Sequence, residues 1–138
     1  MNHTYSQSPV KTLGVQLSPA ALPALAYYSN ILSIVTAVPA IASGIVQLAP
    51  VIQRDGFSSK KAQTGVMHAL ISDLTVFAAV YNWWSRRDTA GFLPSTTNAV
   101  VSAAVVPTVF FAAFLGGQLT YQFGMGIGGG SSSTKKKQ

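Results

Sequence analysis

The sequence contains no cysteine and very little charge. Without cysteine, the chain cannot form disulfides, thiolate nucleophiles or cysteine-ligated metal sites. Only 9% of its 138 residues are charged, whereas about 25% are charged in an average soluble domain. A small soluble protein exposes much of its surface to water and needs charge to cover it. The composition therefore disfavours a soluble domain.

Acidic residues are the scarcest group, with only Asp55, Asp73 and Asp88 against nine lysines and arginines. The resulting net charge of +6 is concentrated in a few short clusters. Nucleic-acid binding needs basic residues spread along one face, whereas short basic clusters are typical of the flanks of membrane spans. We therefore expect the lipid bilayer as a partner, and no nucleic acid.

Long uncharged stretches are what the sequence has in abundance. They cover approximately residues 24–51, 63–84 and 98–123, with a single charged residue among them. At about 1.5 Å per residue, each stretch is long enough to cross a hydrocarbon core of roughly 30 Å. We predict an all-α fold, an integral membrane bundle of about three transmembrane helices, with kinks at Pro39 and Pro107.

The two ends of the chain differ in composition from the stretches between them. Residues 1–20 form a polar tail, and residues 125–138 are rich in glycine, serine and lysine. Such segments bury too little apolar surface to order themselves. We predict a transmembrane helical domain over residues 21–124, flanked by disordered termini.

Basic residues are shared unequally between the two sides of the predicted bundle. The first loop and the C-terminal tail hold six: Arg54, Lys60, Lys61, Lys135, Lys136 and Lys137. The N-terminal tail and the second loop hold three: Lys11, Arg86 and Arg87. Because positively charged loops stay in the cytosol, the C-terminus is predicted to be cytosolic.

The C-terminal lysines also suggest an organelle. Lys135 and Lys136 stand four and three residues from the C-terminus. Lysines there, on a cytosolic tail, look like the dilysine retrieval signal of endoplasmic-reticulum membrane proteins, and a solvated basic tail is the other interpretation. A mitochondrial membrane is the alternative localisation, because no acidic residue precedes Asp55.

The second predicted span carries a polar face. At 100° per residue, the following residues share it: Thr64, Gly65, His68, Ser72, Thr75, Ala79 and Asn82. Polar groups in a span are expected to face other helices, because lipid cannot satisfy their hydrogen bonds.

Asp73 lies at the edge of this face, near the centre of the span. An ionised Asp at the bilayer centre costs about 3 kcal/mol, so it should be protonated or partnered. Two interpretations are open. Asp73 is either a functional group or a staple hydrogen-bonded to another span through Asn30, Ser33 or Thr36.

His68 lies in the middle of the polar face and has three interpretations. It is a haem ligand between helices, a proton relay with Asp73, or a hydrogen-bonding partner of a neighbouring helix. The other histidine, His3, lies in the tail, so a haem site would take its second axial ligand from another chain. The sequence has no catalytic motif and no metal-ligand spacing. We therefore expect no enzyme activity from the chain alone, and no metal site.

Small residues indicate close helix packing in two places. Ala40 and Gly44 form a small-xxx-small pair in the first span. Gly116 and Gly117 lie in the third span, and Gly124 follows it. Glycines allow backbones to approach closely, and a glycine after a span ends the helix.

Two segments resemble a known family. His68–Asp73 resembles a His-Ala-x-x-Asn segment, and Leu115–Gly126 resembles a Gly-Gly-x-Leu-x-Tyr-x-x-Gly-x-Gly ending. Both are similar to an uncharacterised family of small multi-pass membrane proteins, known only as a domain of unknown function. The fungal members are the most similar, in the basic tail and in the segment from Val38 to Gly44.

The sequence departs from this family in two places. The family usually opens with a further helix that bears a His-Pro-x-x-x-His-Phe-Pro pattern, and residues 1–20 do not contain it. Ser72 stands where the family often has Asn. The chain therefore resembles a three-span version of a four-span fold. Relatives joined to iron–sulfur domains imply membrane redox chemistry for the family.

Three functions are consistent with these observations. The first is a structural or partner-binding membrane component that packs against other subunits, or against itself, through its Gly and Ala faces. The second is a haem-binding or redox module that uses His68. The third is a proton-linked carrier that uses Asp73.

Overall fold

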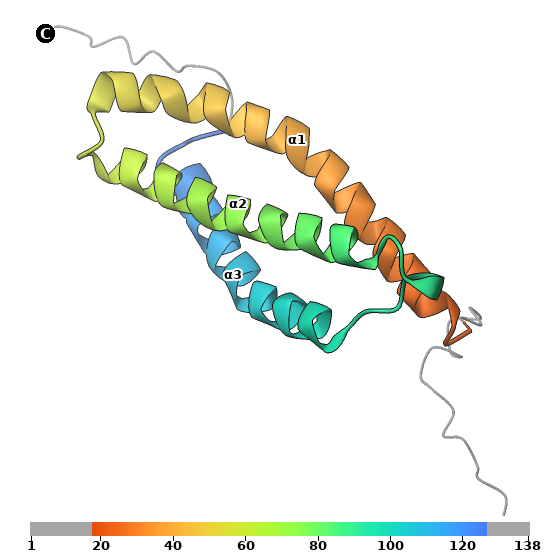
Figure 1. Ribbon diagram of the computed structural model, residues 1–138. Coiled ribbons are helices and arrows are strands. Elements are labelled where there is room, and N and C mark those ends of the chain that lie inside the picture. Colours follow the sequence, from red (N-terminus) through yellow and green to blue (C-terminus); the bar gives the residue numbers. More distant parts are fainter. Residues whose placement is uncertain (1–17, 127–138) are drawn as a thin grey trace, which may run out of the picture.

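The computed structural model describes residues 18–126, and Figure 1 shows their arrangement. The elements are α1 (Ala21–Asp55), α2 (Lys60–Arg86), the short 3-10 helix η2 (Ala90–Phe92) and α3 (Thr96–Tyr121). Three helices are long and apolar enough to cross a membrane, and the described residues contain no strand. The all-α integral membrane bundle is therefore confirmed. The predicted tail disorder concerns mainly residues 1–17 and 127–138, which lie outside the described range.

Local side-chain chemistry sets the starts of α2 and α3. The Ser59 hydroxyl accepts a hydrogen bond from the Ala62 amide at 3.2 Å and caps α2. Ser95 and Asn98 form a capping box, in which each side chain bonds the amide of the other. These bonds satisfy amide groups that have no partner within the helix.

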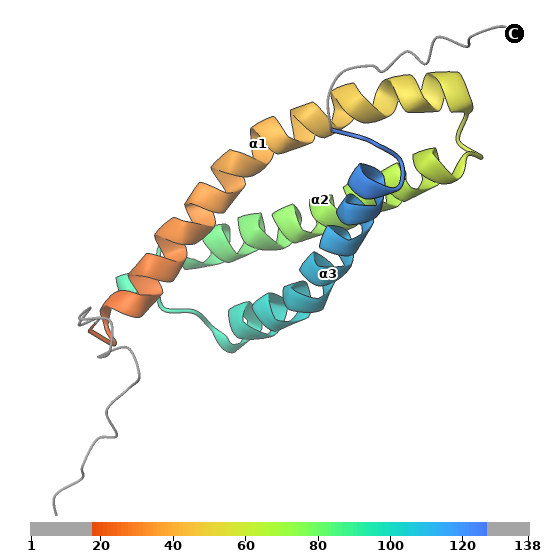
Figure 2. The ribbon, with the colours of Figure 1, turned by 180° about the vertical axis from the view of Figure 1, so that it is seen from behind.

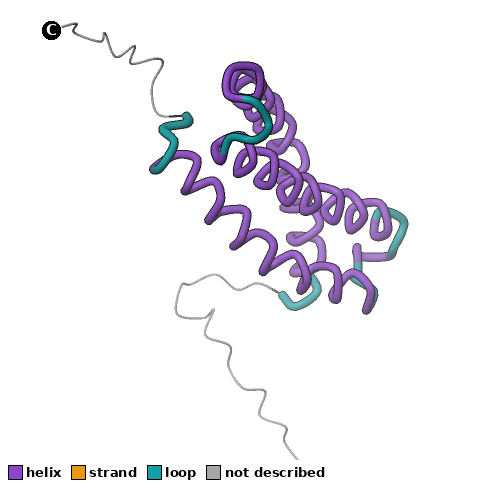
Figure 3. The backbone as a smooth tube through the Cα atoms, turned by 90° about the vertical axis from the view of Figure 1, so that its left-hand side faces the viewer, coloured by secondary structure: helices purple, strands orange, loops and turns teal. Residues whose placement is uncertain are grey.

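α2 is the central helix of the bundle. It packs along both α1 and α3, whereas α1 and α3 make hardly any close contact with each other. Figures 1 and 2 show α1 arching over α2 and changing direction between its orange and yellow halves. α1 contains Pro39 and Pro50, and each proline removes one backbone hydrogen bond. Figure 3 shows the same helices from another side, with the loops between them in teal.

The outward faces of the helices are apolar. On α2, the exposed large side chains include Met67, Leu70, Leu74, Phe77 and Tyr81, which lie opposite the polar face. A surface of this kind is stable in lipid and unstable in water. The protein is therefore an integral membrane protein whose apolar side chains contact the bilayer.

Two contacts fix which loops share a side. The Lys61 ammonium donates to the Phe123 carbonyl at 2.9 Å, so the first loop and the end of α3 lie together. The Arg86 guanidinium donates to the Pro23 carbonyl at 2.8 Å, so the second loop lies beside the start of α1. The count of basic residues on each side of the membrane assumed this same grouping of loops and chain ends. The cytosolic placement of the C-terminus stays a prediction.

A polar cavity in the membrane-spanning region

A cavity of about 580 Å³ lies between α1, α2 and α3. This volume is in the range of ligand-binding pockets. Its walls are mostly apolar, and seven of its side chains are polar: Ser43, Gln47, His68, Ser72, Asp73, Thr75 and Thr120. It occupies the half of the bundle between Asp73 and the first loop, and we call this half the open half.

Asp73 lies at the midpoint of α2, with half of the helix on either side. Its side chain is half-buried and borders the cavity. A helix of 27 residues is about 40 Å long, so Asp73 is about 20 Å from either end. The carboxyl group is therefore at the depth where lipid is least able to solvate it.

The structure does not support the interpretation of Asp73 as a staple. Among residues 18–126, none donates a hydrogen bond to its carboxyl group. Each of the three expected partners bonds elsewhere: Asn30 donates to the Ala79 carbonyl, Ser33 to the Asn30 carbonyl, and Thr36 to the carbonyls of Leu32 and Ser33. α1 and α2 are thus joined by Asn30, and Asp73 remains available to the cavity.

Ser72 and Thr75 share the cavity with Asp73. The Thr75 hydroxyl donates to the Ser72 carbonyl at 2.7 Å, a bond within one turn of the same helix. The Ser72 hydroxyl has no hydrogen-bond partner among the described residues. The polar face of α2 therefore offers the cavity a carboxyl group and two hydroxyl groups near mid-membrane.

His68 joins α2 to α3 and also borders the cavity. Its Nδ1 lies 2.9 Å from the Ala112 carbonyl oxygen. Because a carbonyl can only accept, Nδ1 carries the proton in this contact, and Nε2 of the neutral ring is an acceptor. The ring packs over Gly116, where an added Cβ atom would lie 3.2 Å from its Cε1. Gly116 thus makes room for His68.

The other small residues that were expected to pack against a helix are not covered by one. Ala40 and Gly44 border the cavity, and a Cβ atom added to Gly44 would have nothing within 4 Å. Gly117 also has open space around it and does not border the cavity. Within the described chain, Gly44 and Gly117 therefore meet no other helix closely, and Ala40 is exposed. Packing through them stays a prediction that concerns other chains.

Sequence reasoning missed a close contact between α1 and α2. A Cβ atom added to Gly65 would lie 2.5 Å from Cδ1 of Leu48. An added methyl group would therefore force the Leu48 side chain to move, so glycine at position 65 lets Leu48 pack against α2. Gly65 was placed on the polar face from its spacing, but its partner on α1 gives no signal in the sequence.

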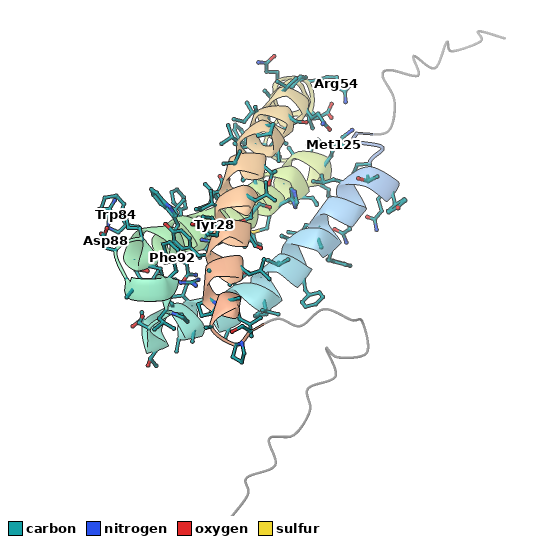
Figure 4. The ribbon with its side chains drawn as sticks, turned by 90° about the vertical axis from the view of Figure 1, so that its right-hand side faces the viewer. Tyr28, Arg54, Trp84, Asp88, Phe92 and Met125 are labelled. Atoms are coloured by element: carbon teal, nitrogen blue, oxygen red, sulfur yellow. The ribbon has the colours of Figure 1, made fainter. Side chains whose placement is uncertain are left out.

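The segment after α3 crosses toward α1 and borders one end of the cavity. Gly124 and Gly126 have φ angles of 63° and 80°, which favour glycine, and the Met125 amide bonds the Leu119 carbonyl at 2.9 Å. A Cβ atom added to Gly126 would lie 3.5 Å from Oε1 of Gln47 on α1. Figures 1 and 2 show this crossing in blue, and Figure 4 labels Met125. Gly124 therefore turns the chain toward α1 at one end of the cavity, after α3 has ended.

The other half of the bundle, from Asn82 to η2, is tied by a polar network, and we call it the closed half. Asn98 donates to the Asn82 side chain at 2.9 Å and to the Ser85 hydroxyl at 2.6 Å. Asn82 also bonds the Ser102 hydroxyl at 3.4 Å. The network joins α2 to α3 and buries both asparagines. Asn82 was identified from the sequence, and its partner Asn98 was not.

Arg86 is the second tie of the closed half and was expected only to mark the membrane surface. Its side chain is buried and donates to the Phe92 carbonyl at 2.9 and 2.7 Å, besides the bond to Pro23. The guanidinium lies 5.8 Å from the ring centroid of Tyr27, which stacks on Phe92 at 4.1 Å. Phe92 has a φ of 56°, an unfavourable conformation for a residue with a Cβ. Arg86 and Tyr27 hold it in place, and the Tyr28 ring, labelled in Figure 4, lies 5.6 Å from the Phe92 ring between centroids.

Comparison with known proteins identifies the family. Neither the curated proteins nor the solved structures include a match to this chain. The family described as "Predicted membrane protein (DUF2231)" matches residues 12–129, which include both the His68 segment and the glycine-rich ending. The finer similarity to fungal members stays a prediction. With most of its length covered by this match, the chain belongs to the DUF2231 family of membrane proteins.

Proposed function

We propose that this protein is a partner-binding component of a membrane assembly, and that it binds a transmembrane helix of another subunit in the cavity between α1 and α3. The observation that carries the proposal is the uncovered middle of the polar face of α2. Ser72 and Asp73 lie near mid-membrane, border the cavity and lack hydrogen-bond partners among the described residues.

The bilayer gives a physical reason for a partner. Lipid chains offer no hydrogen bonds, so polar groups at this depth are stable only against protein or water. A transmembrane helix satisfies its own backbone and can present side chains to Asp73 at a fixed depth. The α1 wall supports this view, because Ala37, Ala40 and Gly44 would let a helix approach closely.

The glycines provide a matched test. Gly44 borders the cavity and Gly117 does not, yet an added Cβ atom would meet nothing within 4 Å at either position. Gly44→Leu should therefore project a bulky side chain into the cavity without disturbing the fold. The assembly is extracted from its native membrane into polymer nanodiscs, and its mass is measured. We expect Gly44→Leu to release a subunit and Gly117→Leu to retain it.

Two results would argue against this proposal. A wild-type particle that contains only this chain would show that no partner subunit is bound. An unchanged mass in Gly44→Leu would show that a partner, if present, binds elsewhere. Circular dichroism of both variants confirms that the helices remain intact.

A second function, haem binding at His68, is favoured by one observation. The bond from Nδ1 to the Ala112 carbonyl leaves Nε2 as an acceptor on a residue that borders the cavity. His68 would supply one axial nitrogen, and the bound partner would supply the other ligand. Haem would give the assembly electron-transfer chemistry.

An absorption spectrum of the native assembly tests the haem proposal. We expect a Soret band that shifts on reduction with dithionite and is lost in His68→Ala but kept in His3→Ala. A featureless spectrum from the intact assembly would exclude it. The carrier function of Asp73 stays a prediction of the sequence, which pH-dependent flux lost in Asp73→Asn would support.

The proposed location is the endoplasmic reticulum, with the C-terminus in the cytosol. Support comes from Lys135 and Lys136, which lie outside the described residues. With a fluorescent protein fused to the N-terminus, Lys135→Ala with Lys136→Ala should move the signal to later compartments of the secretory pathway. Location in mitochondria in both forms would favour the alternative.

A further inference from the structure

We propose that the helix bound in the cavity carries a lysine or arginine at the depth of Asp73. This inference rests on the function proposed above and names the chemistry of the partner. The inference is based on the distribution of charged residues along the helices. Between Lys61 and Arg86, Asp73 is the only charged residue of α2, and α3 has none.

Among residues 18–126, no basic side chain is paired with this carboxyl group. In α1, the charged residues are Arg54 and Asp55, at the end of the helix and paired with each other at 2.8 Å. Lys61 and Arg86 are each bonded to carbonyl groups at opposite ends of the bundle. A carboxylate within a membrane is commonly paired with a basic side chain, so the matching charge is expected from outside.

The surroundings of Asp73 suit an ammonium or guanidinium group. The cavity has room for a long side chain, and the hydroxyl groups of Ser72 and Thr120 border it as additional acceptors. A cation has several N–H donors, and one acceptor would leave most of them unsatisfied. The cavity therefore offers both the charge and the hydrogen bonds that a basic residue needs.

A second copy of this chain does not fit as the partner. Its spans have no lysine or arginine away from their ends. Its His68 is five residues from the depth of Asp73, about 7.5 Å along a helix axis, and Nδ1 already bonds Ala112. A parallel copy could not bring a cation to the carboxylate, so the partner is a different polypeptide.

Synthetic transmembrane peptides test this inference on the full chain. Three Leu/Ala helices of about 23 residues, long enough to span the bilayer, differ only at the centre, which is lysine, norleucine or glutamine. The protein is labelled through Phe57→Cys, an exposed loop position in a chain without other cysteines. Energy transfer in phosphatidylcholine vesicles gives the dissociation constant of each peptide.

We expect the lysine peptide to bind at least tenfold more tightly than the norleucine peptide, with glutamine between them. Asp73→Asn keeps the shape of the side chain and should abolish this preference. Equal binding of all three peptides would overturn the basic-residue inference while leaving helix docking intact. The absence of binding by any peptide would instead count against the docking proposal. Energy transfer between two labelled copies without peptide would identify a second copy as the occupant and overturn the inference.

Discussion

The open half and the closed half of this bundle are built from the same three helices but use polar side chains differently. In the closed half, Asn82, Asn98 and Arg86 all bond to other elements of the chain. In the open half, Ser72 and Asp73 face a cavity instead. A polar residue in a membrane span can therefore either tie two elements of the chain together or remain available to a ligand or partner. Whether it has a hydrogen-bond partner within the chain distinguishes the two cases. We therefore propose that the closed half is a scaffold and that the open half binds the partner helix.

The largest effect should come from Arg86, which ties α1, α2 and η2 together. Arg86→Ala removes three hydrogen bonds, two to the Phe92 carbonyl and one to the Pro23 carbonyl. We expect a loss of about 3 kcal/mol in the free energy of unfolding, measured by denaturation in mild detergent.

The neighbouring arginine is the control for this prediction. Arg87 is exposed, pairs with Asp88 and lies over the Trp84 ring. Arg87→Ala should cost less than about 1 kcal/mol, because surface ion pairs and exposed cation–π contacts are weak. Equal losses in the two variants would show that the closed half is not held by Arg86.

An intermediate effect is expected at Asn98, in comparison with Ser72. Asn98→Ala removes both the capping box of α3 and the bond to Asn82. A loss of about 1.5 kcal/mol follows from the cap and the interhelical bond together. Ser72→Ala should change the stability of the isolated chain by less than about 0.5 kcal/mol, because its hydroxyl bonds no described residue. Similar losses of stability in Asn98→Ala and Ser72→Ala would contradict the distinction between the two halves.

The smallest effect should come from the glycine that separates α1 from α2. Gly65→Ala places a methyl group against Leu48 and should cost about 1 kcal/mol. In a Leu48→Ala background, the same substitution should cost almost nothing, so a double-mutant cycle measures the contact. Gly44→Ala provides the comparison from the open half, where added volume meets no neighbour. A loss of stability in Gly44→Ala would contradict the presence of empty space beside Gly44.

The helices were predictable because their signals are local. The predicted stretches 24–51, 63–84 and 98–123 lie close to α1, α2 and α3, whose exact ends depend on caps at Ser59 and Ser95. Helix spacing also predicted which residues share the polar face of α2. Uncharged length and periodicity depend on neighbours along the chain, and the sequence displays these directly.

The ties between helices were not predictable, because they depend on which residues face each other in space. Asn98 was read as the start of a span, Arg86 as a surface charge, and Asn30 as a candidate partner for Asp73. In the structure, Asn30 bonds the Ala79 carbonyl instead. Backbone carbonyls accept from Arg86, His68 and Asn30, and a carbonyl is present at every position, so its use leaves no mark in the sequence.

The most direct test of the docking proposal uses two neighbouring positions on α1. Ile45 borders the cavity and Val46 does not, and both are exposed in the isolated chain, at 62% and 72%. A spin label on Ile45→Cys or Val46→Cys reports its contact with lipid through collisions with dissolved oxygen. In native membranes, we expect position 45 to be shielded and position 46 to be accessible, with the difference lost after purification in detergent. Equal accessibility in the native membrane would contradict a helix bound between α1 and α3.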